Sequence, residues 1–199
     1  MEKLRVRKLG GAGGGLPPVW YRFRGRLFLP IVVFLLLCHS GESEAWFVFP
    51  AGTALFLAGF AARVWAQVHL RYRLDVPRVL TTTGPYAYVR NPAYIGSTLI
   101  LLGLCVASEL LWFLPAMLAW CVIVFGGAVR YEEAHLLRKH GEPYRRYLAR
   151  VPRWRPRFRR PEGAGAPGVG PFLLPSLLVE SSGLLAFVLL AAKEVLSAG

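Results

Sequence analysis

Residues 94–129 form an almost uninterrupted apolar segment that is too long for one crossing of a lipid bilayer. A transmembrane helix needs about 20 predominantly apolar residues. The segment is broken only at Ser108 and Glu109. Because a polar pair in this position can end one helix and start the next, we expect a tight helical hairpin of residues 94–107 and 110–129.

Three further apolar segments surround this hairpin. Residues 27–38 are continuously apolar but short, whereas residues 45–68 are long enough to span a bilayer. Residues 171–192 form the last apolar segment, which carries Glu180 near its middle. With 55% hydrophobic residues over the whole chain, this pattern predicts an all-α, polytopic membrane protein of about five transmembrane helices.

Basic residues indicate how the helices are oriented. The chain has 24 Lys and Arg against 11 Asp and Glu, a formal net charge of +13. The basic residues concentrate before residue 27, within residues 63–90 and within residues 130–160, and the loop 39–44 has none. Since Lys and Arg flanking a span stay in the cytoplasm, we expect the N-terminus and the loops near residues 90 and 150 to be cytoplasmic. The same charges attract anionic lipid, so no nucleic-acid partner is expected.

The composition divides the chain into four regions. Residues 1–26 are expected to be a basic cytoplasmic tail, and residues 27–156 the membrane domain. Residues 157–170 are basic and then rich in Gly and Pro, which indicates a linker. Residues 171–199 would add an extra C-terminal apolar helix. A compact chain without an evident organelle signal suggests a prokaryotic plasma membrane, and the oligomeric state stays open.

Cysteine and histidine give no metal-binding pattern. The three cysteines lie in apolar segments without a close pair, which is typical of buried free thiols. His135 and His140 are five residues apart, off the spacing that places two ligands on one helix face. We therefore expect no metal site.

The stretch GPYAYVRNPAY, at residues 84–94, is unusual beside a membrane helix. Pro92 keeps Asn91 out of helical geometry and suits the first turn of the next helix. Backbone amides at that helix start, together with Arg90, would bind a carboxylate or another anion. The alternative is interfacial anchoring, with Arg90 reaching the head groups beside three tyrosines, Tyr86, Tyr88 and Tyr94.

A second polar stretch follows the hairpin. The last apolar helix is expected to continue through VRYEEAHLLRKHG and to stop at Gly141. A short helix over residues 142–150 would then place Tyr144, Tyr147 and Leu148 on one side. Adjacent residues on a helix point about 100° apart, so at most one of the two glutamates is expected to face a common site. Alternatively both are solvated and pair with Arg130. The glutamates are Glu132 and Glu133.

Two stretches resemble, in their order and spacing, the C-terminal core of the isoprenylcysteine carboxyl methyltransferases and the related phospholipid N-methyltransferases. They are GPYAYVRNPAYIG and EEAHLLRKHGEPYRRYLARVPRWRP. The resemblance covers residues 80–156. It implies an integral membrane methyltransferase built from helices, which uses S-adenosylmethionine bound in a cytoplasm-facing pocket formed by these two motif regions. It also implies a lipophilic acceptor that enters from the membrane lipids and carries a carboxylate, an amine or a thiol.

The resemblance assigns roles residue by residue. The residues expected to bind the cofactor are Tyr86, Arg90, Asn91, Pro92, Tyr94, Glu132, Glu133, Tyr144 and Tyr147. Those expected to act on the acceptor are Arg153, Arg90 and Glu133, because an arginine can orient a carboxylate and a glutamate can take a proton from an amine. Asn91 departs from the histidine that many members carry. Two alternatives remain, an NADPH-dependent reductase of the sterol type, which shares a similar Arg-x-Pro-x-Tyr element, and a non-catalytic membrane scaffold.

Overall fold

The computed structural model describes residues 19–23, 26–38, 46–74, 80–157 and 170–197, and these residues form helices and turns without a strand. Most of the predicted basic tail and of the predicted linker lies outside the described residues. The elements are α2 (Val19–Phe23), η1 (Arg26–Phe28), α3 (Leu29–Leu37), α4 (Val48–Leu74), η2 (Gly84–Ala87), α5 (Pro92–Ala107), η3 (Leu111–Phe113), α6 (Leu114–His140), α7 (Glu142–Arg150), η4 (Gly170–Phe172) and α8 (Leu173–Ser197).

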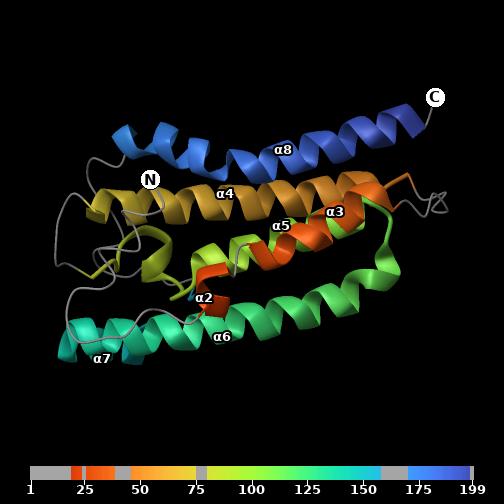
Figure 1. Cartoon of the computed structure of the whole chain (residues 1–199). Helices are drawn as coiled ribbons and strands as arrows, with labels where there is room; N and C mark the ends of the chain where they lie inside the picture. Colours follow the sequence, from red (N-terminus) through yellow and green to blue (C-terminus); the bar gives the residue numbers. More distant parts are fainter. Residues whose placement is uncertain (1–18, 24–25, 39–45, 75–79, 158–169, 198–199) are drawn as a thin grey trace.

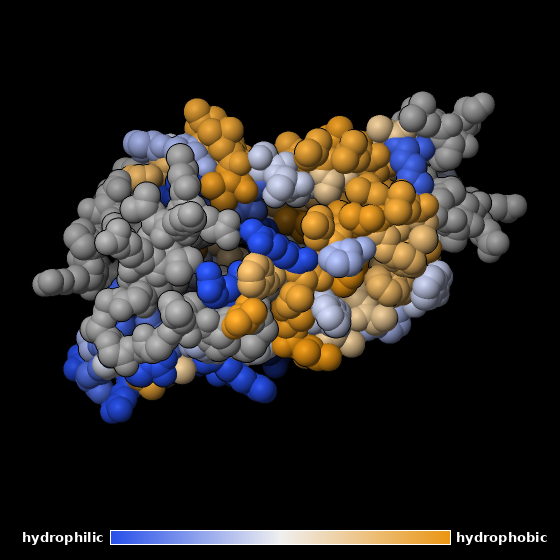
Figure 2. Space-filling model, in the orientation of Figure 1, coloured by the Kyte–Doolittle hydropathy of each residue, from blue (hydrophilic) through white to orange (hydrophobic). Residues whose placement is uncertain are grey.

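The long helices α8, α4, α5 and α6 lie side by side in that order (Figure 1). Three helical stretches are long and apolar enough to cross a membrane, namely Val48–Arg71, Leu111–His140 and Gly170–Lys193. Arg26–Leu37 and Pro92–Ala107 are apolar but shorter. Figure 2 shows apolar surface over the helices, with strongly hydrophilic residues gathered at the end where α7 lies. The predicted all-α, polytopic membrane fold is thereby confirmed.

The predicted helix ends of the motif regions are also confirmed. Helix α5 begins at Pro92, preceded by Asn91 in a non-helical conformation. The hairpin turn falls at residues 108–109, where Glu109 has a φ of 60°. Helix α6 continues to His140 and stops at Gly141, which has a φ of 57° that glycine adopts readily. The two motif regions therefore lie at the same end of the α5–α6 hairpin.

Glycines bring α4 and α5 into close contact. A Cβ atom added at Gly103 of α5 would lie 2.5 Å from the backbone nitrogen of Phe56 and 2.8 Å from the carbonyl oxygen of Gly52, both on α4. One added at Gly59 would lie 2.6 Å from the carbonyl oxygen of Gly96. Small residues at such crossings allow two membrane helices to approach closely. This contact places the start of α5, and with it the first motif, against α4.

We expect Gly103→Ala to destabilise the protein by about 1–3 kcal/mol, because the added methyl group meets backbone atoms that cannot move aside easily. Gly126→Ala on α6 is the matched control, since an added Cβ there meets nothing within 4 Å. Thermal unfolding of the purified protein in detergent measures both. Equal midpoints for the two variants would contradict the close crossing.

Helix α8 is joined to α4 by an ion pair within the apolar region. Glu180 is only 5% exposed. Its carboxylate accepts hydrogen bonds from Nε and Nη2 of Arg63, at 2.6 Å and 2.9 Å. Arg63 also donates from Nη1 to the hydroxyl of Ser97 on α5. The carboxylate that lies near the middle of the last apolar segment is therefore paired with α4 of the same chain.

Candidate functional site

Glu133 lies between two arginines where the motif regions meet. Its Oε1 atom is 3.1 Å from Nη1 of Arg90 and 3.1 Å from Nε of Arg153, and its Oε2 atom is 2.5 Å from Nη2 of Arg153. The Glu133 side chain is only 11% exposed. Its hydrogen bonds raise the pKa of the Arg153 guanidinium above its usual value. The structure thus brings together the three residues expected to act on the acceptor.

Arg90 also holds the chain that follows α7. Nε of Arg90 donates to the carbonyl oxygen of Val151, and Nη2 donates to that of Leu148. Its backbone amide donates to the carbonyl oxygen of Pro152, and Asn91 Nδ2 lies 3.3 Å from the carbonyl oxygen of Arg153. Each side-chain nitrogen of Arg90 therefore already donates a hydrogen bond, and these bonds connect the first motif to the second.

Glu132 lies in different surroundings from Glu133. Its Oε1 atom accepts hydrogen bonds from the hydroxyl of Tyr94 on α5 at 2.8 Å and from that of Tyr21 on α2 at 2.6 Å. The expected divergence of the two glutamates is thereby observed. The suggested pairing with Arg130 is not, because Glu133 pairs with Arg90 and Arg153 instead.

Three tyrosines form the apolar part of this end. Tyr144 and Tyr147 are buried together with Val151, and Tyr147 donates from its hydroxyl to the carbonyl oxygen of Tyr86 at 2.8 Å. Burial raises the pKa of Tyr144 to about 12. Burial, and secondarily Glu132, also raises the pKa of Tyr86, while burial raises that of Tyr147. All three hydroxyls therefore stay protonated at neutral pH, where they can donate hydrogen bonds.

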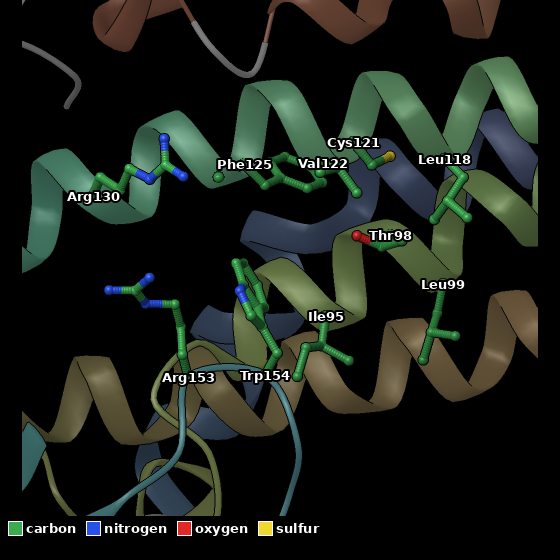
Figure 3. A pocket seen from close by; sticks show the side chains of 11 residues that line it. Ile95, Thr98, Leu99, Leu118, Cys121, Val122, Phe125, Arg130, Arg153 and Trp154 are labelled. Atoms are coloured by element: carbon green, nitrogen blue, oxygen red, sulfur yellow. The ribbon is translucent and has the colours of Figure 1, made fainter. Parts of the chain in front are cut away.

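An apolar groove of about 460 Å³ separates α5 from α6 beside this cluster (Figure 3). Val122, on its α6 wall, is 65% exposed, so the groove reaches the outer surface of the helices. At the polar end Arg130 and Arg153 lie on facing sides, with the indole of Trp154 beside them (Figure 3). The remaining lining residues are Ile95, Thr98, Leu99, Leu118, Cys121, Phe125 and Gly126.

Sequence reasoning identified Arg153 but missed Trp154 and the groove itself. Arg130 was considered only as an ion-pair partner of the glutamates. Gly126 of α6 also lines the groove, and a Cβ atom added there would meet nothing within 4 Å. Within the described ranges no three His, Cys, Asp or Glu side chains come together as metal ligands could.

Residues 48–143 match the phospholipid methyltransferase family. The match confirms the resemblance to membrane methyltransferases that the two motifs indicated. It includes Arg90, Glu132 and Glu133 but ends before Tyr144 and Arg153.

Two curated bacterial proteins are similar to this chain. The nickel-cobalt-cadmium resistance protein NccN of Alcaligenes xylosoxydans xylosoxydans is 27% identical over 135 residues, which cover 64% of this chain and 60% of that protein. The cobalt-zinc-cadmium resistance protein CzcN of Cupriavidus metallidurans is 27% identical over 132 residues, which cover 64% of this chain and 59% of that protein. The chain thus spans about three fifths of the length of these relatives. No solved structure matches it.

Proposed function

We propose that this protein transfers a methyl group from S-adenosylmethionine to a lipophilic acceptor held in the α5–α6 groove. The observation that carries the proposal is the position of the groove, which runs from the apolar surface of the helices to Arg153 in the motif cluster. A lipophile can therefore reach the polar cluster without leaving the apolar region. The arginine-rich end would face the cytoplasm, where soluble cofactor is available.

The residues of the motif regions fit the chemical groups of S-adenosylmethionine. Bound there, the cofactor would supply an electrophilic methyl group on a cationic sulfur. Aromatic faces attract cations, and Tyr94 packs against Phe125 with ring centroids 5.1 Å apart. Glu132 offers a carboxylate that suits an ammonium group or ribose hydroxyls. The start of α5 suits a carboxylate.

The two arginines would have different tasks. Arg90 holds Glu133 and the backbone after α7, so it would position the site. Arg153 contacts Glu133 on one side and lines the groove on the other, so it would orient the acceptor. Excluding water and holding the acceptor in line with the methyl group would supply most of the rate acceleration.

Calorimetric titration of S-adenosylmethionine, and separately of NADPH, into the detergent-purified protein tests the proposal. We expect binding of S-adenosylmethionine alone, weakened at least about tenfold by Glu132→Gln, since one charge-assisted hydrogen bond contributes about 1.5–3 kcal/mol. Glu142→Gln is the matched control, because within the described ranges Glu142 pairs only with exposed arginines on α7. Binding of NADPH alone would favour a reductase, and binding of neither would favour a scaffold.

A further inference from the structure

The polar end of the α5–α6 groove carries positive charge that the described part of the protein does not neutralise. Arg130 is exposed on α6, lines the groove, and makes no hydrogen bond or ion pair with the described residues. Arg153, on the facing side, has a partner in Glu133, but its side chain is still 41% exposed. Two guanidinium groups therefore border the point where the apolar walls end (Figure 3).

Among the described residues, none that lines this groove carries a carboxylate or an imidazole. Glu133 is hydrogen-bonded to two arginines and Glu132 to two tyrosines, and neither glutamate lines the groove, so the head group of an acceptor bound there would not meet their carboxylates. An amine acceptor would meet like charges at Arg130 and Arg153. A negatively charged head group would form charge-assisted hydrogen bonds with them.

We propose that Arg130 is a specificity-determining residue, which together with Arg153 selects for the groove a single-chain amphiphile with a carboxylate head group. This inference rests on the proposed function, for which it specifies the acceptor. The apolar walls would hold the chain, and the volume of about 460 Å³ lies within the roughly 300–1,000 Å³ of ordinary small-molecule sites.

A carboxylate also suits a groove that lacks a base. One carboxylate oxygen would form the bond to the methyl carbon while the bond from that carbon to the donor sulfur breaks and leaves its electron pair on sulfur. The products would be a neutral ester and a neutral thioether, and no proton would be transferred. The ester no longer carries the charge that Arg130 and Arg153 attract, which favours its release.

Binding of brominated lipids tests this selection without requiring turnover. Brominated stearic acid and brominated stearyl alcohol would be titrated into the full-length protein in phosphatidylcholine bilayers at mildly alkaline pH. Quenching of tryptophan fluorescence reports binding, and Trp154→Phe identifies the part of the signal that comes from the groove. We expect the acid to bind at least about tenfold more tightly than the alcohol, as one charge-assisted contact provides.

The variants separate charge recognition at the groove from general surface charge. Arg130→Gln should remove most of the preference for the acid and leave the alcohol unaffected, while Arg130→Lys should keep much of it. Arg138→Gln, at an exposed position on the same helix outside the groove, should change nothing. Equal binding of acid and alcohol, an unchanged preference in Arg130→Gln, or tighter binding of brominated stearylamine would overturn the proposal.

A brominated lysophosphatidic acid tests the head group itself. If it bound more tightly than the acid, the carboxylate assignment would be wrong. S-adenosylmethionine binding is measured separately. Failure of acceptor selection with the cofactor still bound can therefore be distinguished from selection of the acid without cofactor binding.

Discussion

The Glu133→Gln variant is expected to lose about 2–3 kcal/mol of the free energy of unfolding, and to bind S-adenosylmethionine weakly. Removing the charge leaves the guanidinium groups of Arg90 and Arg153 beside each other without their shared carboxylate. Breaking a fully buried ion pair costs about 3–5 kcal/mol, and the smaller value here allows for the solvent exposure of Arg153. Thermal and denaturant unfolding in detergent measure the loss.

Glu142→Gln is the control for this variant. Glu142 is 58% exposed and lies 3.6–3.9 Å from two exposed arginines of α7. Such surface pairs contribute about 0–1 kcal/mol, so we expect its unfolding to match that of the unmodified protein. If Glu133→Gln unfolded like Glu142→Gln, the central position of Glu133 in the motif cluster would be refuted.

Replacing the two arginines separately should resolve their tasks. Arg90→Gln should be the more destabilising change, because it also removes the donors to the carbonyl oxygens of Val151 and Leu148. Within the cluster, the side chain of Arg153 hydrogen-bonds to Glu133 alone, so Arg153→Gln removes fewer contacts than Arg90→Gln. The order of the two unfolding free energies therefore distinguishes a positioning residue from one available to an acceptor.

The sequence predicted the ends of the motif helices well because the signals for them are local. Pro92 and Gly141 act through their own backbone geometry, whatever they contact in the folded protein. The Ser108–Glu109 break and the short helix α7 were predictable for the same reason. The expectation that Glu132 and Glu133 diverge followed from helix geometry alone.

Long-range partners could not be predicted in this way. Tyr21 binds Glu132 across 111 positions of sequence, and no local pattern links the two. The groove was missed for another physical reason, because a helix face that lines an apolar cavity and one that faces lipid have the same composition. Leu118 and Val122 on α6 illustrate this, since they both line the groove and remain exposed.

The partner of Glu180 was likewise hidden from the sequence, although an ionisable residue inside an apolar segment indicated that one exists. We expect Glu180→Leu to destabilise the protein by about 2–4 kcal/mol, because Arg63 on α4 would then lie in the apolar region without its carboxylate. The loss should appear as a lower midpoint of thermal unfolding in detergent. It should be accompanied by weaker docking of α8.

Docking of α8 can be measured by cross-linking. The rings of Phe49 on α4 and Phe187 on α8 have centroids 6.4 Å apart, so a flexible thiol-specific cross-linker should join cysteines placed at these two positions. In the Glu180→Leu background we expect this reaction to slow markedly. An unchanged rate would show that apolar contacts alone hold α8 in place.

The double variant Arg63→Leu/Glu180→Leu decides whether the ion pair or the loss of polarity is responsible. Replacing both members of a buried pair with apolar residues is often neutral, whereas removing one leaves a charge without a partner. We therefore expect the double variant to recover more than half of the stability lost in Glu180→Leu. Ser97 would lose its contact with Arg63 but keep its hydrogen bond to the carbonyl oxygen of Ala93. If the two single losses simply added, Arg63 and Glu180 would be acting independently. In that case α8 would depend on its apolar contacts with α4 rather than on their pairing.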